Sequence, residues 1–209
     1  MSYCTDFQTL TLILGDSQLA SEQVWDFIDF AIVDKSIKSR RFLPRRALEN
    51  ASQRQIVLRV IKEDPTLDGV VTSIKEKEEF AEDVFSNARK LFLACIYCEL
   101  PMRCLRMFLE SSITDERLPL SEKECPEDYK RVYKNAFLSS QHLFLAPSFE
   151  LGRSRNFTYD KIEIIPISYA ESKPSGKGGF GSVYPITIHP DHHTLHPVRR
   201  FCRTGQIGS

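Results

Sequence analysis

Apolar residues recur every third or fourth position through most of the first 146 residues of the chain. This spacing is typical of α-helices that bury one face. The stripes run over 17–38, 56–61, 73–99, 102–109 and 129–137. Several helices of this kind must cover one another's apolar faces, so residues 1–146 are predicted to form a helical, bundle-like domain.

Serines and prolines mark where several of these helices are expected to begin. Ser17 or Ser21 is expected to cap the helix over 17–38, because a hydroxyl oxygen can accept a free N–H of the first turn. Pro44 and Pro101 are expected at the first position of the helices that follow them, where no N–H is needed.

The stripe over 73–99 is the longest, and it predicts a single helix with the acidic letters "EKEE" near its positive end. The helix before it must stop at Asp64, because Pro65 disfavours the helical conformation of the residue it follows. Ser121 and Glu124 have the spacing of a capping box and predict the start of the last helix, whose apolar face includes Val132.

Basic residues gather around the Phe-Leu-Pro at 42–44. They are Lys38, Arg40, Arg41, Arg45 and Arg46. Such a cluster can bind an acidic partner, or it can form a solvated turn between helices. We favour the turn, because a handful of exposed cations is normal on any protein surface.

The composition changes after Pro147. Residues 147–160 are predicted to be a linker, and the β-branched residues of "KIEIIPISY" (161–169) favour a strand. The segment "SVYPITIHP" (182–190) has the same character. Residues 161–209 are therefore predicted to be a second unit, in which two extended segments flank a glycine-rich run.

The run "GKGGFGSVY" begins at Gly176 and contains the pattern G-x-G-x-x-G. A dinucleotide-binding fold needs a helix directly after this pattern, and residues 182–188 favour a strand instead. The lysine-ended phosphate loop is absent too. We therefore expect a glycine hairpin, in which Gly176, Gly178 and Gly181 let backbone N–H groups approach phosphate oxygens without a Cβ in the way.

Phe180 and Val183 extend the pattern to G-x-G-x-F-G-x-V, which resembles the glycine-rich loop of eukaryotic protein kinases. The stretches "RFLPRRALE", "ARKLFLACIYCELP", "LFLAPSFE", "IIPIS" and "VYPITIHPDHH" resemble the helical region, linker and first kinase strands of fungal protein kinase-like proteins. The resemblance implies a serine/threonine kinase family that binds ATP with magnesium. The nucleotide-binding residues it implies are Gly176, Lys177, Gly178, Gly179, Phe180, Gly181, Ser182 and Val183.

The resemblance is incomplete. Ser175 stands where kinases place an aliphatic residue, and Pro185 lies in the second strand, where proline is tolerated at an edge or a bulge. Phosphoryl transfer also needs a third-strand lysine, a catalytic aspartate and a magnesium-binding aspartate. No lysine follows Lys177 and no aspartate follows Asp191.

The fold class expected from these features is mainly α. A helical domain (1–146) and a linker (147–160) precede a small β hairpin, read as the truncated start of a kinase N-lobe (161–209). Such a chain is expected to be inactive alone. In the alternative reading, the helical domain is a non-catalytic interaction or scaffold module and the kinase remnant is inert.

Cysteines and histidines offer further alternatives. Cys95, Cys98 and Cys104 give C-x-x-C-x5-C but lack the second pair that a zinc site needs, so they are expected to be small core residues. The tract "HPDHHTLH" (189–196) can bind a transition metal, and it also fits a polar turn after a strand. No metal site is predicted.

The 28 basic residues balance the 28 acidic residues, so net charge gives no reason to expect nucleic acid or an anionic membrane as a partner. The apolar run at 10–14 is too short for a signal sequence or a membrane span. Six cysteines without a signal favour reduced thiols in the cytoplasm or nucleus. The expected partners are ATP and a protein, either a substrate or a ligand of the helical domain.

Overall fold

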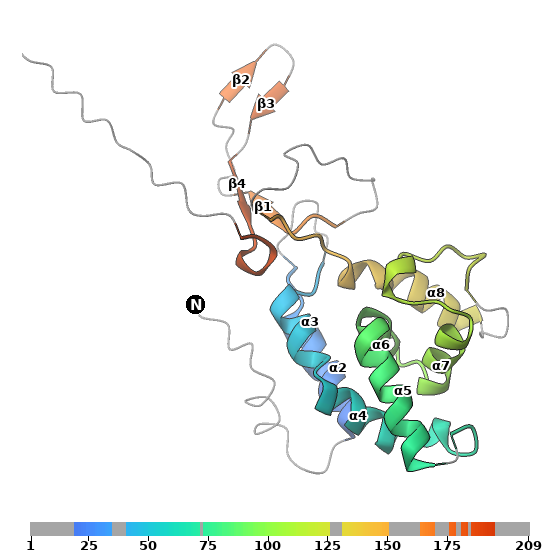
Figure 1. Ribbon diagram of the computed structural model, residues 1–209. Helices are drawn as coiled ribbons and strands as arrows, with labels where there is room; N and C mark the ends of the chain where they lie inside the picture. Colours follow the sequence, from blue (N-terminus) through green and yellow to red (C-terminus); the bar gives the residue numbers. More distant parts are fainter. Residues whose placement is uncertain are drawn as a thin grey trace, which may run out of the picture.

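The computed structural model describes residues 19–34, 41–71, 73–125, 131–150, 164–169, 176–178, 181–183 and 185–194, which are mainly helical (Figure 1). The α-helices are α2 (Ala20–Ala31), α3 (Arg45–Ala51), α4 (Arg54–Glu63), α5 (Ile74–Asn87), α6 (Arg89–Tyr97), α7 (Met102–Glu110) and α8 (Arg131–Ser140). Short 3-10 turns are η2 (Pro65–Leu67), η3 (Asp115–Arg117), η4 (Gln141–Phe144) and η5 (Pro190–His192). The prediction of a mainly helical fold is confirmed.

Helix α6 lies at the centre of the helical body. Its residues 91–96 are all buried, so the helix has no solvent-facing stripe over this stretch. It contacts α2, α3, α5, α7 and α8. A helix that is apolar all round is stable when neighbours cover every side, and the amphipathic helices around α6 supply that cover.

The amphipathic helices follow the predicted stripes. Helix α4 buries Val57, Val60 and Ile61 and ends at Glu63, as the proline after Asp64 predicts. The Asp64 carboxylate then accepts the N–H of Thr66 at 2.7 Å and begins η2. The Asp64 side chain thus accepts an N–H that would bond to a backbone carbonyl if the helix continued.

The predicted single helix over 73–99 is wrong. The chain forms α5 and α6 instead, which are separated at Ala88, where φ is −144° and ψ is 35°. The Asp115 carboxylate accepts the N–H of Lys90 at 2.9 Å and that of Leu91 at 3.0 Å, so α6 has a capped N-terminus of its own. The break lets α6 enter the core while α5 stays at the surface with one buried stripe.

The predicted serine cap of α2 is wrong. The N-cap is Leu19, and the Glu22 carboxylate accepts its N–H at 3.3 Å. Ser21 lies within the first turn of the helix, and Ser17 is outside the described residues. The Glu22 carboxylate, at the third helical position, thus accepts the N–H of the N-cap residue, and this contact involves no serine hydroxyl.

Helix α2 also ends earlier than the predicted 38. It stops at Ala31, and Val33 then forms a two-way backbone bridge with Phe42, with N···O distances of 2.9 and 3.2 Å. The bridge satisfies backbone groups that would otherwise belong to a further helical turn.

Two predictions for the last helix are wrong. Val132 was expected in the core and is 75% exposed, because α8 packs through Phe137, whose ring lies 5.1 Å from that of Phe108. Ser121 and Glu124 do bind each other, since the Glu124 carboxylate accepts the N–H and hydroxyl of Ser121. They lie in a turn, however, and α8 begins at position 131.

The described residues between 164 and 194 form a small β unit. Strand β1 (Ile167–Tyr169) pairs antiparallel with β4 (Ile186–Ile188), and β2 (Gly176–Gly178) pairs antiparallel with β3 (Gly181–Val183). Figure 1 shows β2 and β3 farther from the helices than β1 and β4. The β unit contacts the helical body where η5 meets α3.

Candidate functional site

The predicted glycine run lies in β2 and β3. Gly176 pairs with Val183, Lys177 with Ser182 and Gly178 with Gly181. Gly179 and Phe180, which join the two strands, lie outside the described residues. The described part of the run is therefore extended on both sides of the 179–180 connection.

Among the described residues, the two strand pairs form two separate ladders. Six residues (170–175) separate Tyr169 from Gly176, whereas two (184–185) separate Val183 from Ile186. The shorter arm contains Pro185, which has no N–H to donate to a ladder. The prediction that Pro185 lies within the second strand is therefore wrong: it lies between β3 and β4, where it need not donate to a ladder.

The described structure does not require glycine at position 176. A Cβ added there would meet no atom within 4 Å, and its φ lies outside the left-handed range that disfavours other residues. Neither packing nor backbone conformation therefore excludes a side chain at this position. A ligand group that approaches the backbone needs such open space beside the strand.

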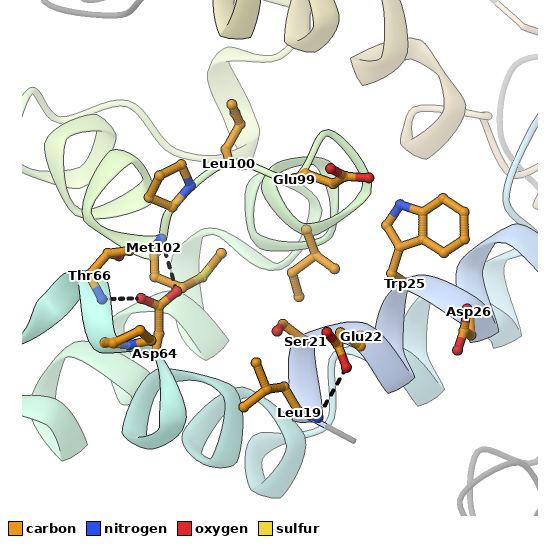
Figure 2. Close-up of a pocket in the computed structure, with 13 residues that line it drawn as sticks. Leu19, Ser21, Glu22, Trp25, Asp26, Asp64, Thr66, Glu99, Leu100 and Met102 are labelled. Atoms are coloured by element: carbon orange, nitrogen blue, oxygen red, sulfur yellow. Dashed lines mark hydrogen bonds between the residues drawn. The ribbon is translucent and has the colours of Figure 1, made fainter. Parts of the chain in front are cut away.

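A groove of about 590 Å³ lies between the start of α2 and the turn from α6 to α7 (Figure 2). Trp25, Leu100 and Met102 give it an apolar part. The indole N–H of Trp25 donates to the carbonyl of Tyr97 at 3.2 Å, and the two rings stack with centroids 6.2 Å apart. The groove thus presents an aromatic ring held in a fixed orientation.

All the charged residues that line this groove are acidic. They are Glu22, Asp26, Asp64 and Glu99. Asp64 is structural, since its carboxylate also accepts the N–H of Met102 at 3.3 Å. Glu99 is exposed and has φ of 54°, a conformation that glycine usually adopts after a helix. Figure 2 shows its side chain extending toward Trp25, which favours a cationic ligand.

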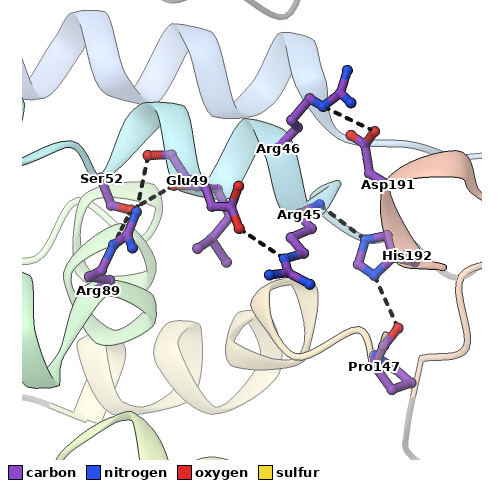
Figure 3. A network of polar contacts seen from close by, with 9 residues as sticks. Arg45, Arg46, Glu49, Ser52, Arg89, Pro147, Asp191 and His192 are labelled. Carbon is purple, nitrogen blue, oxygen red and sulfur yellow. Dashed lines mark hydrogen bonds and ion pairs between the residues drawn. The ribbon is translucent and has the colours of Figure 1, made fainter. Parts of the chain in front are cut away.

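A second cavity, of about 390 Å³, lies where the β unit meets the helical body. Its charged and titratable lining residues are Arg45, Glu49, Arg89, Lys90, Asp115 and His192. Figure 3 shows Arg89 donating to the Ser52 hydroxyl (2.9 Å) and the Glu49 carbonyl (3.1 Å). Burial raises the pKa of Asp115, and the N–H groups that it accepts from α6 oppose this rise. These groups hold α3, α6 and η3 together.

The basic cluster around 42–44 is paired within the chain where it is described. The pairs are Arg41 with Asp29 (3.5 Å), Arg45 with Glu49 (2.8 Å) and Arg46 with Asp191 (3.8 Å). Lys38 and Arg40 lie outside the described residues. The three described cations are largely exposed, as expected for a solvated turn.

The cysteines and histidines of the described segments do not form a metal-binding cluster. Within the described ranges, no three His, Cys, Asp or Glu side chains are placed to hold an ion. Cys95 and Cys104 are buried, as expected for small core residues. Burial raises the pKa of Cys98 to about 11, and a hydrogen bond with Ser140 opposes the rise, so this group stays a thiol.

None of the helices in the described ranges combines the length and apolar character that a bilayer crossing requires. No protein-family model, curated protein or solved structure matches the chain.

Proposed function

We propose that this chain carries the phosphate-contacting glycine hairpin of a serine/threonine protein kinase-like protein on a helical domain. The observation that supports this proposal is the pairing of 176–178 with 181–183, which puts glycines on both strands beside the 179–180 connection. Backbone N–H groups flanked by glycine can approach phosphate oxygens without a Cβ between them.

The kinase resemblance assigns each residue a role in this proposal. Gly176, Gly178 and Gly181 would line the triphosphate of ATP, Phe180 would cover it and Val183 would contact the adenine. The open space beside Gly176 is compatible with a ligand group. Magnesium would be held by the triphosphate, because the described residues offer no metal-binding group.

Binding by the chain alone is expected to be weak, and phosphate transfer is not expected. In the described part of the chain, β2 and β3 pair with each other and with no third strand, and such ribbons are marginally stable. Transfer would also need the lysine and aspartates that position and neutralise the phosphates. No lysine follows Lys177 to take the first of these roles.

A titration with Mg-ATP, followed by NMR at the backbone amides of β2 and β3, tests the proposal. We expect saturable shifts with a Kd of roughly 1 mM or weaker, equivalent to a binding free energy of about −4 kcal/mol or less favourable. Gly178→Asp should abolish them, because it brings a Cβ and a carboxylate to the phosphate side. Thr187→Asp adds the same charge to an exposed position of β4 and should leave binding unchanged.

Either of two results would contradict nucleotide binding at the glycine hairpin. One is a folded wild-type protein whose β2 and β3 amides do not shift with Mg-ATP. The other is equal binding in the wild type and Gly178→Asp, which would place the nucleotide elsewhere. Phosphate incorporation above the Gly178→Asp control would show instead that the chain is an active kinase.

The acidic groove favours a second function, in which the helical domain docks a short peptide that bears Arg or Lys next to an apolar residue. The apolar part would bury the aliphatic residue, and Trp25 would accept the cation on its ring face. Glu99 would supply the opposing charge. This docking role belongs to the helical domain and needs no glycine hairpin.

Fluorescence anisotropy of a labelled peptide with two arginines and a leucine tests the groove. Glu99→Gln keeps the shape of the side chain, and it should weaken binding several-fold at low salt. Glu116→Gln removes an exposed carboxylate from η3, outside the groove, and should have no effect. Equal affinity of the two variants would rule out a role for the groove.

A further inference from the structure

His192 connects the β unit to the helical body through both nitrogens of its ring (Figure 3). Its Nε2 accepts the backbone N–H of Arg45 at 3.1 Å, so Nε2 carries a lone pair and no proton. Its Nδ1 lies 3.0 Å from the carbonyl oxygen of Pro147, and a carbonyl oxygen can only accept. The two contacts together require a neutral ring with its proton on Nδ1.

The Arg45 amide is the first N–H of helix α3. The N-cap of this helix, Pro44, makes no side-chain capping bond, and His192 takes that role from a distant part of the chain. A second proton on His192 would sit on Nε2 and face the Arg45 N–H, donor against donor. It would also add positive charge at the positive end of α3. The protonated ring therefore cannot keep this contact.

The surroundings do not favour a charged ring. The charged and titratable groups near it are Arg45, Arg46 and Glu49 of α3, Arg89 and Lys90 of α6, Asp115 of η3, and His189, Asp191 and His193 of its own segment. The carboxylates are already engaged by Arg45, by Arg46 and by the N-terminus of α6. Burial lowers the pKa of His192, with His189 and Arg45 acting in the same direction; the Pro147 carbonyl and Asp191 oppose this.

We propose that His192 is a proton-sensitive latch, which holds the β unit against the helical body when neutral and releases it when protonated. The backbone around the ring would be released with it. Phe149 donates its N–H to the His192 carbonyl at 2.8 Å, and Thr194 donates to the Phe149 carbonyl at 3.0 Å. The latch concerns how the β unit is attached, so it does not depend on nucleotide binding.

The edge contacts of Phe42 add a packing component to the latch. Its ring lies 5.4 Å from that of His192 and 5.5 Å from that of His189, both near perpendicular. Phe42 itself is fully buried. Loss of the His192 contact would therefore expose an aromatic side chain of the helical body, which makes opening cooperative rather than gradual.

The tautomer of His192 is the first test, because it needs no variant. NMR of the ring nitrogens at about pH 8 should show the proton on Nδ1, with Nε2 as the acceptor. A proton on Nε2 would overturn the latch, since the Arg45 contact could not then exist.

Hydrogen exchange, corrected for its intrinsic pH dependence, is the second test. The peptides covering 41–49 and 186–194 should exchange up to about tenfold more readily one pH unit below 6.5 than one unit above it. His192→Gln keeps an acceptor for the Arg45 N–H without titrating, so its exchange should not depend on pH. His189→Gln removes the neighbouring histidine and should keep the wild-type response.

Far-UV circular dichroism confirms that each variant retains its helices, so that global unfolding is not mistaken for release. A pH response that persists in His192→Gln, or that disappears in His189→Gln, would overturn the proposal. So would a wild-type protein whose exchange at 41–49 and 186–194 is independent of pH.

Discussion

The carboxylate of Asp115 accepts the N–H of Lys90 at 2.9 Å and thereby caps a helix that begins earlier in the chain. The same carboxylate accepts the N–H of Leu91 at 3.0 Å. The cap is tertiary, because 25 residues separate donor and acceptor in the first of these contacts. The central helix of the domain thus depends on a turn that follows α7.

Asp115→Ala should destabilise the protein by about 1–2 kcal/mol, because it leaves two N–H groups at the start of α6 without acceptors. Asp115→Asn keeps one acceptor oxygen and should cost less. Urea unfolding followed by circular dichroism measures both. Glu116→Ala, at an exposed position in the same turn, is the control and should change stability by no more than about 0.5 kcal/mol. Equal losses in Asp115→Ala and Glu116→Ala would mean that the cap contributes nothing.

Helix α8 offers a matched pair of substitutions. Phe137 is fully buried against Phe108, whereas Val132 on the same helix is 75% exposed. Phe137→Ala should cost about 3–5 kcal/mol, since it removes a large core side chain and leaves a cavity. Val132→Ala should change stability by no more than about 0.5 kcal/mol. A similar cost for both, in denaturant unfolding, would mean that α8 does not pack through Phe137.

The sequence predicted those parts of the fold that depend on local signals. Helices α4 and α7 carry one apolar stripe each, and a proline bounds each of them, so the apolar spacing and the helix-breaking residue indicate the same boundary. Pro101, however, is the N-cap of α7 rather than its first residue as predicted. The break at Ala88 could not be predicted, because its cause is the carboxylate of Asp115 in a later turn. Val132 was misassigned for a related reason: the stripe on α8 is wide, and the packing partner decides which edge is buried.

The same distinction applies to the candidate sites. The glycine run was found because all its residues lie together in the sequence. The acidic groove was missed because Glu22, Asp64 and Glu99 come from separate segments that meet after folding. The His192 contact with α3 spans 147 residues and carries no motif at all. The histidine tract contains His192, but its composition suggested a metal site and not a contact with α3.

Cys98 should be unreactive in the folded protein. Burial raises the pKa of its thiol to about 11, so roughly one molecule in a thousand carries the thiolate at about pH 8. Iodoacetamide labelling, mapped by mass spectrometry, should therefore be at least about a hundredfold slower at this residue in native protein than in urea. Equal labelling rates in the two conditions would show that Cys98 is neither buried nor protonated.

The stability that His192 contributes should depend on pH in a defined direction. Burial places its folded-state pKa below the ordinary value of 6.5, so the unfolded chain binds the proton more readily than the native protein does. The contribution is therefore complete above about pH 6.5 and is lost as the pH falls toward the lowered native value. His192→Ala should cost about 1–2 kcal/mol at about pH 8, from the lost cap of α3, and less at about pH 5. Phe137→Ala is the control for this pH dependence, because its cost arises from apolar packing and should be the same at both pH values. Urea unfolding at the two pH values measures the difference. A cost of His192→Ala that stays constant or grows in acid would show that the native ring need not be neutral.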